Sequence, residues 1–417
     1  MENKRWILED GNQQAELKAQ ELQQCLQEYA SINVEDNNKQ FFKNITFLGS
    51  NQRRKAMLKD AESRNYKSEV DFDKDNYLYN CYNGTLNLNT FQLQPHNSQD
   101  FITKISPVVF NKNAKSVEFM DFIKAITCDD DELARFLQKI LGLSLSGNIY
   151  EECFFIFYGP RGRNGKSTLI ETISYLHGGS SGYSIQTAAE TFAFSPYKNS
   201  RIASGDIARM TKYRFISTTE LPAGLNMDTS LLKSLTGGDT IVARRLYQEE
   251  KQFKQTGKIY MHTNYLPYTS DRTLFSSQRV YVVPFDRYFS QEERDRGLKT
   301  RLIEPENLSG IFNWLLEGFK IYKEEGLNPP KRVLEATNTF QNNSNKFQKF
   351  LHDCFIPAID NFTKMSEAYE VFKHWCQNQG MPAERLKEFK EMIRNHGVFK
   401  EREGNVYNVI VGYKLKV

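Results

Sequence analysis

Residues 153–168 carry the sequence CFFIFYGPRGRNGKST. The first six residues are apolar or aromatic, and the run stops abruptly at Gly159 and Pro160. A short apolar run bounded by turn residues is typical of a strand buried on both faces of a parallel sheet. Residues 169–176 then return to helical spacing. The stretch therefore predicts a buried strand, a glycine-rich turn and a helix in direct succession.

The turn carries the residue types that bind phosphate. Glycines let backbone N–H groups turn toward phosphate oxygens, and the N-terminus of the following helix adds favourable partial charge. We expect Lys166 to reach the β- and γ-phosphates and the Ser167 hydroxyl to bind Mg²⁺. The predicted nucleotide-binding residues are Gly159, Gly162, Arg163, Asn164, Gly165, Lys166, Ser167 and Thr168.

The turn departs from the usual phosphate-binding pattern at one position. Glycine is expected five residues before Gly165, where this chain has Pro160, and Gly159 lies one residue earlier. The turn is therefore predicted to be one residue longer than usual. A chance glycine-rich surface turn is the alternative, and the strand before it and the helix after it argue against that alternative.

Two later strands end in polar side chains. Residues 213–220, YRFISTTE, end in Glu220, and residues 259–264, IYMHTN, end in Asn264. A nucleotide hydrolase needs a carboxylate near Mg²⁺ to hold a metal-bound water and orient the attacking one. A carboxamide on a neighbouring strand could bind both the γ-phosphate and that water. We interpret His262 as a hydrogen-bonded packing residue.

The chain divides into three predicted domains. Residues 1–115 are mainly helical, with a small β-element after the Asn83-Gly84 turn signal. Residues 116–327 alternate helices and strands, which predicts an α/β layered domain. Asn328-Pro329-Pro330 is interpreted as a linker to residues 328–417.

The last domain is predicted to contain two helices followed by a β-hairpin. Ala368, Phe372 and Trp375 recur at helical spacing, a second helix follows Pro382, and a turn is expected at Gly404-Asn405. This order resembles a winged-helix module. A basic stripe on the second helix is either a DNA contact or a solvated face, and it consists of Lys387, Lys390 and Arg394.

Composition narrows the class of protein. Of 417 residues, 39% are hydrophobic and 25% charged, which suits a globular chain with a core. The net charge of +4 permits nucleic-acid binding without requiring it. No apolar stretch is long enough for a transmembrane helix, and no signal core follows Met1, so we expect a cytoplasmic protein or one of a viral replication compartment. The six cysteines lack zinc spacing and suit a reducing compartment.

Residues 233–254, KSLTGGDTIVARRLYQEEKQFK, are the most distinctive part of the chain. Here the sequence resembles the superfamily-3 helicases, especially the phage/plasmid and poxvirus-type primase-helicases. The resemblance covers about residues 75–325 and, more weakly, the C-terminal segment. It implies an AAA+-like ATPase core that binds ATP and Mg²⁺, with Ser167 and Glu220 at the metal.

The resemblance also implies catalytic roles. Lys166 would hold phosphate, Glu220 would activate water and Asn264 would position it. Arg279 aligns with the arginine that completes the active site of a neighbouring subunit, although this chain has only one arginine where relatives often have two. Its rivals for that role are Arg272, Arg244 and Arg245.

The resemblance further implies that the segment of residues 233–254 leads into a β-hairpin, which in family members enters the central channel of a hexameric ring. Arg244, Lys251 and Lys254 would then contact DNA, with both lysines at or near the tip; two ordinary exposed lysines are the alternative. The expected partners are single-stranded or forked DNA, further copies of this chain, and a separate primase or polymerase. Asp71 and Asp73 are interpreted as a surface turn rather than a priming site. A nucleotide-dependent switch and an origin-binding protein remain alternative functions.

Overall fold

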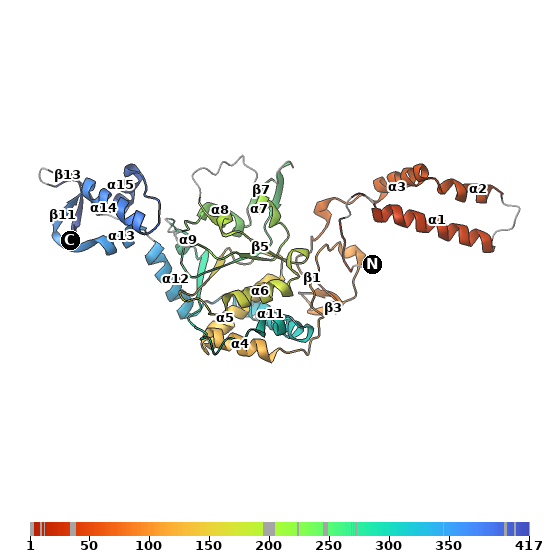
Figure 1. The fold of residues 1–417 in the computed structure, drawn as a ribbon, viewed down its shortest axis with the longest axis horizontal. Coiled ribbons are helices and arrows are strands. Elements are labelled where there is room, and N and C mark those ends of the chain that lie inside the picture. Colours follow the sequence, from red (N-terminus) through yellow and green to blue (C-terminus); the bar gives the residue numbers. More distant parts are fainter. Residues whose placement is uncertain are drawn as a thin grey trace. The chain divides into compact units, whose positions relative to one another are not determined.

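The computed structural model describes residues 4–8, 11, 13–33, 39–194, 205–222, 225–244, 249–267, 269, 271, 273–344, 346–395, 398–403 and 406–416. Figure 1 draws the chain. It separates into two compact units, the first made of Met1–Asp75 and His96–Lys104 and the second of Asn76–Pro95 and Ile105–Val417. Among the described residues, no helix is both long and apolar enough to cross a membrane.

The first unit is helical, as the sequence predicted. Its elements are α1 (Gln13–Asn33), α2 (Lys39–Leu48), α3 (Asn51–Asn65) and the 3-10 turns η1 (Glu69–Asp71) and η2 (Ser98–Asp100). Leu22 and Tyr29 are seven residues apart and lie on one side of α1, yet both side chains are exposed. The side of α1 that packs on its neighbours carries Ala19 and Ala30 instead.

Asp71 and Asp73 have structural partners within this unit. Lys74 pairs with Asp71 at 2.8 Å, and Asp73 accepts hydrogen bonds from the backbone and hydroxyl of Thr103. Both carboxylates serve the turn, which agrees with the interpretation of this pair as a surface feature.

The predicted small β-element opens the second unit. It is an antiparallel sheet of β1 (Leu78–Cys81), β2 (Gly84–Asn87) and β3 (Gln92–Gln94). Arg214 ties this element to the large sheet, because its guanidinium donates to the carbonyl oxygens of Leu78 and Leu145 at 2.8 and 2.6 Å. Lys258 donates similarly to Ser146 O.

A parallel sheet in the order β10-β4-β9-β6-β5 forms the centre of this unit. Its near-continuous apolar strands are what a sheet covered on both faces requires. Its strands are β4 (Phe154–Tyr158), β5 (Ser184–Thr187), β6 (Phe215–Thr218), β9 (Lys258–Thr263) and β10 (Val280–Pro284).

Alternate residues of each strand enter different hydrophobic clusters, so the sheet lies between two helical layers. Phe155, Phe157 and Tyr260 join the first cluster, and Ile156 and Met261 join the second. The first layer includes α4 (Val117–Thr127), α5 (Asp131–Gly142), α6 (Lys166–Leu176), α10 (Leu298–Leu302) and α11 (Pro305–Glu325). The second includes α7 (Gly205–Arg209), α8 (Thr229–Thr236), α9 (Thr273–Ser276) and α12 (Lys331–Ser344).

Between β6 and β9 the chain forms the predicted hairpin of β7 (Thr240–Ala243) and β8 (Lys251–Lys254). After Asn328-Pro329-Pro330, helix α12 still packs on the sheet, since the Thr337 hydroxyl accepts from Val282 N at 3.0 Å. The limits of the three predicted domains remain a prediction.

The C-terminal segment has a hydrophobic cluster of its own, in which the rings of Phe372 and Phe389 stack at 4.5 Å. The two predicted helices are present, and a helix and a strand that the sequence did not indicate precede them. The elements are α13 (Lys346–Cys354), β11 (Phe355–Lys364), α14 (Met365–Asn378), α15 (Leu386–Asn395), β12 (Phe399–Glu403) and β13 (Val406–Leu415). The strands pair antiparallel in the order β11-β13-β12, and the predicted Gly404-Asn405 turn lies outside the described residues.

Candidate functional site

Three predicted site residues meet at the carboxyl ends of adjacent strands. Lys166 begins α6 just after β4, Asn264 follows β9, and Glu220 follows β6. The Asn264 carboxamide joins the other two, because its Oδ1 accepts from Lys166 Nζ at 2.9 Å and its Nδ2 donates to Glu220 Oε1. We call Lys166, Asn264 and Glu220 the strand-end triad.

The Lys166 amine is buried among neutral oxygens. It also donates to Gly159 O at 3.1 Å and to Asn164 Oδ1 at 3.0 Å, and only 4% of the residue is exposed. Burial lowers the pKa of Lys166 to about 8, and the charge of Glu220 opposes this shift in part. Within the described chain Lys166 forms no ion pair, so its charge is solvated by the protein's own amide oxygens.

The glycine-rich turn leaves no room for larger residues at two of its positions. A Cβ at Gly159 would lie 2.1 Å from Asn164 Nδ2, and one at Gly165 would lie 2.4 Å from Ile126 Cγ2. Gly165 also has φ +85°, a left-handed conformation that favours glycine. Gly162 faces open space. Arg163 and Ser167 are exposed and Thr168 is half-buried.

His262 is buried, but it is not the hydrogen-bonded packing residue that the sequence suggested. Its Nδ1 has no hydrogen-bond partner among the residues that the structure describes. His262 lies on β9 opposite Phe157 of β4, on the face that α6 covers. No sequence pattern distinguishes such a nitrogen from a satisfied one.

Arg279 lies away from the strand-end triad of its own chain. It immediately precedes β10, whose first residue pairs with Phe154 at the amino end of β4. Arg279 donates to Glu152 Oε2 at 2.6 Å, to Lys233 O at 3.2 Å and to Thr236 Oγ1 at 3.5 Å. The length of β4 alone, about 15 Å, separates it from the triad end of the sheet.

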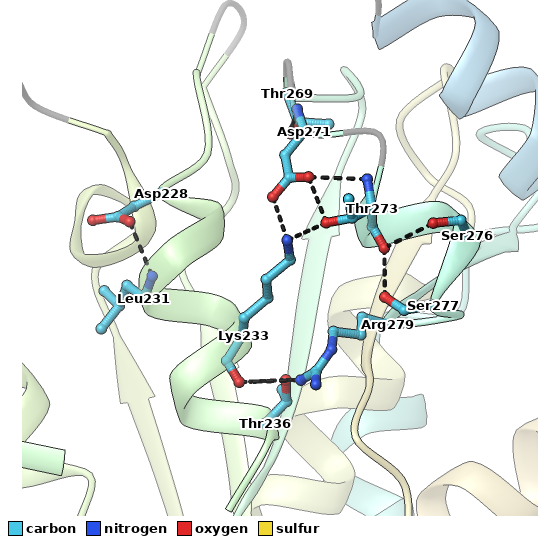
Figure 2. A network of polar contacts seen from close by, with 10 residues as sticks. All are labelled: Asp228, Leu231, Lys233, Thr236, Thr269, Asp271, Thr273, Ser276, Ser277 and Arg279. Atoms are coloured by element: carbon cyan, nitrogen blue, oxygen red, sulfur yellow. Dashed lines mark hydrogen bonds and ion pairs between the residues drawn. The ribbon is translucent and has the colours of Figure 1, made fainter. Parts of the chain in front are cut away.

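Figure 2 shows the polar network around Arg279, with Lys233 extending from α8 toward Asp271. The Lys233 amine bonds both Asp271 Oδ2 and Thr273 Oγ1. Burial alone would raise the pKa of Asp271, but the Lys233 and Thr273 hydrogen bonds outweigh it and lower that pKa. We call Lys233, Thr236, Asp271, Thr273 and Arg279 the α8–α9 cluster.

The hairpin separates the two lysines that were predicted to contact DNA together. Lys251 pairs with Ala243 at the end of the ladder nearer to the connection between β7 and β8. Lys254 pairs with Thr240 at the opposite end. Because side chains alternate along a strand, residues three apart face opposite sides of the ladder. Both lysines and Arg244 are exposed. Residues 245–248, which include Arg245, and the rival Arg272 lie outside the described residues.

The basic stripe of α15 is described in part. Lys387 is exposed and Lys390 half-buried, while Phe389 and Ile393 of the same helix are buried. Arg394 belongs to α15, and its side chain is not among those described. The role of the stripe stays a prediction.

Two family descriptions match the chain. Residues 1–141 match "D5 N terminal like", and residues 157–279 match a family of unknown function, DUF5906. A protein named as a helicase in Acanthamoeba polyphaga mimivirus is 26% identical over 359 residues. One named as a helicase in Frog virus 3 (isolate Goorha) is 23% identical over 274 residues. These matches cover 80% and 62% of this chain but only 37% and 28% of the viral proteins.

Solved structures of the NrS-1 C-terminal region are similar at 15% and 13% identity, each with a TM-score of 0.40. They cover 72% of this chain and 78% and 77% of theirs. The family matches span both the helical first unit and the segment from β4 to Arg279. Taken with the two viral relatives, these matches place the chain in the phage and viral superfamily-3 primase-helicase family.

Proposed function

We propose that this chain is an ATP-dependent replicative DNA helicase of a mobile genetic element or virus, acting as a ring of six identical subunits by analogy with the family. The observation that carries the proposal is the strand-end triad, in which a carboxamide is hydrogen-bonded to a buried lysine on one side and to a carboxylate on the other. The helicase names of the two viral relatives agree with it.

The site suits an anionic ligand. Lys166 is a buried cation whose partners are neutral oxygens, and an ionised phosphate would be a stronger acceptor than any of them. In chain order the parallel strands are arranged 5-1-4-3-2, the order expected of an AAA+-like core. Open α/β sheets bind ligands beyond the carboxyl ends of their strands, where the strand order reverses. Lys166 occupies that position next to β4.

Each member of the triad has a defined task in hydrolysis. Magnesium ATP would supply the phosphoanhydride to be cleaved and a metal that offsets phosphate charge. Lys166 exchanges its neutral partners for phosphate and keeps its proton at pH 7, because that pH lies below its pKa of about 8. Glu220 accepts a proton from the attacking water, and Asn264 orients that water while bonded to Glu220. Ser167 offers a hydroxyl to the metal.

Arg279 would act on a neighbouring subunit. Its position at the amino end of the sheet prevents it from serving the triad of its own chain. An arginine supplied in trans stabilises transition-state charge and can raise hydrolysis rates by about 10³–10⁵. This assignment supports a ring in which every site is shared by two subunits.

DNA contact is assigned to the hairpin. Arg244 directly precedes residues 245–248, Lys251 begins β8 three residues after them, and both side chains are exposed. Cations in such a position bind the phosphate backbone in a largely sequence-independent and salt-sensitive manner. Hydrolysis would move the hairpins of the ring and carry the DNA strand with them.

Origin binding is a second candidate function, favoured by the C-terminal segment. Helix, strand, two helices and two strands follow one another from α13 to β13, and this is the order of a winged helix. In that arrangement α15 takes the place of the recognition helix, with Lys387 on its exposed side. Competition between origin-derived and random duplexes for the purified chain tests this function.

The ATPase assignment is tested by two substitutions with different expected outcomes. Lys166→Ala removes the cationic phosphate partner and should lower phosphate release by at least about 100-fold. Glu220→Gln keeps the size of the side chain and loses the base, so it should bind ATP with near-normal affinity and hydrolyse it very slowly.

Lys299→Ala is the matched control, because it removes an exposed lysine that pairs with Glu171 of α6 outside the triad. It should hydrolyse ATP and separate a forked duplex as the unaltered chain does. Normal turnover by a folded Lys166→Ala protein would refute the site. Loss of ATP binding in Glu220→Gln would make Glu220 a structural residue.

A further inference from the structure

Two buried histidines belong to the layer between α6 and the sheet, and they differ in hydrogen bonding. His177 caps the end of α6, with Nδ1 2.9 Å from Tyr79 Oη and Nε2 2.8 Å from Ser144 Oγ. Burial, followed by the charges of Arg214 and Lys258, lowers the pKa of His177 to about 3. His177 is therefore a neutral packing histidine with both nitrogens satisfied.

His262 lies toward the opposite end of the same helix. Only 8% of the residue is exposed, yet Nδ1 is buried without a hydrogen-bond partner among the described residues. Leaving a buried polar group unpaired is costly, and such groups in native structures call for an explanation. His262 of β9 precedes Asn264 by two residues, and Asn264 directly follows the strand, so the alternation of side chains directs both toward the α6 face.

The charged groups around His262 include two members of the strand-end triad, Lys166 and Glu220. Burial lowers its pKa; among nearby charges, Glu220 raises it, Lys166 lowers it and Glu171 raises it. Lys166 and Glu171 come from α6, and Glu220 lies beyond β6. The imidazole is therefore neutral at neutral pH. It can offer a lone pair or an N–H at Nδ1, according to its tautomer.

We propose that His262 is a positioning residue of the nucleotide site, and that its Nδ1 finds its missing hydrogen-bond partner in the bound magnesium nucleotide. The partner is either a water of the metal's coordination shell or a phosphate oxygen. The inference rests on the proposed ATPase function. It explains why a polar side chain is kept at a buried position where an apolar one would pack without an unpaired atom.

Two substitutions separate this role from packing. His262→Met roughly preserves volume and removes the polar atoms, and His262→Gln retains hydrogen-bonding capacity. If His262 only packs, the methionine variant should bind nucleotide normally and be as stable as the unaltered chain or more so. If it positions the nucleotide, glutamine should function better than methionine although methionine is the better core residue.

The measurement is calorimetric binding of a non-hydrolysable ATP analogue to the full chain, with and without Mg²⁺. We expect His262→Met to weaken binding with Mg²⁺ by about 3- to 10-fold, the effect of one lost hydrogen bond, and His262→Gln to restore most of it. A loss seen only with Mg²⁺ assigns the partner to the metal's water shell, and a loss in both conditions assigns it to a phosphate oxygen.

The pH dependence of binding gives a second readout. Protonation of His262 would add a cation beside the bound polyphosphate, so the affinity of the unaltered chain for the analogue should rise as the pH falls through the lowered pKa of His262. Glutamine does not titrate, so this rise should be absent in His262→Gln. If His262 only packs, the two proteins should show the same pH dependence of binding.

Thr218→Val is the matched control. The Thr218 hydroxyl is also buried without a partner in the described part of the chain, but Thr218 shares with Ile216 the face of β6 opposite to the α6 layer. Its removal should leave nucleotide affinity unchanged. Unaltered affinity in His262→Met together with lost binding in Lys166→Ala would overturn this inference alone. Unaltered affinity in both would overturn the proposed ATPase site as well.

Discussion

At the carboxyl end of the parallel sheet, Lys166 is buried and bonded to neutral oxygens, whereas in the α8–α9 cluster each cation meets a carboxylate. Lys233 pairs with Asp271, and Arg279 pairs with Glu152 at 2.6 Å. The cluster is thus electrostatically complete within one chain. In the strand-end triad the cation Lys166 is hydrogen-bonded to the Asn264 amide. The carboxylate Glu220 is bonded to the other side of that amide and does not pair with Lys166 directly.

This difference indicates which charged side chains are available to bind an anionic ligand. A buried cation without an adjacent carboxylate loses solvation that an anion would restore, so Lys166 favours phosphate binding. Arg279 already has an anionic partner, so in the proposed ring the phosphate of a neighbouring subunit would have to compete with Glu152 for it. Buried Lys258 shows that carbonyl oxygens alone can also hold a lysine permanently, so position at the glycine-rich turn is the second part of the argument.

The largest expected effect concerns Arg279 and would sharpen this contrast. If Arg279 leaves Glu152 to act in trans, Arg279→Ala should still bind ATP but hydrolyse it about 10³-fold more slowly or worse. Mixed with Lys166→Ala protein, it should form rings with some interfaces that hold an intact Lys166 and an intact Arg279. Phosphate release from the mixture should exceed that of either variant alone.

Mixed rings must be demonstrated first, by co-purification of differently tagged subunits. A ring in which every site must work would also stay inactive when mixed. The control for that case is a covalently linked dimer with a single interface that holds an intact Lys166 on one subunit and an intact Arg279 on the other. If mixed rings form and the linked dimer is also inactive, Arg279 acts within its own chain. Its bonds to Glu152 and Lys233 O would then be its whole function, and the contrast between the two regions would fail.

A smaller effect is expected at the hairpin that follows α8. Lys251 and Lys254 face opposite sides of the ladder, so one DNA strand cannot be contacted equally by both. We expect Lys251→Ala to weaken single-stranded DNA binding and to reduce the slope of log affinity against log salt by about 0.7, the value for one phosphate contact. Lys254→Ala is the matched control, and it should change the DNA affinity and the salt slope much less than Lys251→Ala does.

Basal ATP hydrolysis should remain in both variants, because the hairpin is separate from the strand-end triad. Fluorescence anisotropy across a salt series makes the measurement. Equal losses in the two variants would show that the ladder does not present a single DNA-facing side, and Lys387 and Lys390 of α15 would be tested next.

The strand-end triad was predictable because its geometry follows from parallel strand order. Polar residues that end apolar parallel strands meet at one edge of the sheet, so Lys166, Glu220 and Asn264 could be grouped without coordinates. It was also predictable that Lys251 and Lys254 face opposite sides, because side chains alternate along a strand and these two residues are three apart. The resemblance to a family hairpin grouped them at the tip instead, and the ladder register corrects that expectation for Lys254.

Other features depend on contacts that no local pattern encodes. Glu152 and Lys233 lie 127 and 46 residues from Arg279 in sequence, and nothing near any of them indicates the pairing. Strand β11 was missed because Pro357 lacks an N–H and argues against a strand. In the structure the pairing of β11 with β13 shifts register between Pro357 and Phe362, which accommodates the proline.

The smallest expected effect tests whether the α8–α9 cluster is complete within the chain. Asp271→Asn keeps the shape of the side chain and removes the charge that faces Lys233, so we expect a loss of about 1 kcal/mol in the free energy of unfolding at pH 7. The pKa of Asp271 is lowered in the folded chain, so its stabilisation is present above the unfolded pKa of about 4 and is lost as the pH falls further. The difference between the two proteins in urea unfolding should therefore be constant from pH 7 to about pH 5 and shrink below about pH 4. A difference that does not change with pH would mean that the asparagine disturbs packing rather than charge. No difference at any pH would mean that the ion pair contributes nothing to folding, and Lys233, like Lys166, would then be free to serve a ligand or a neighbouring subunit.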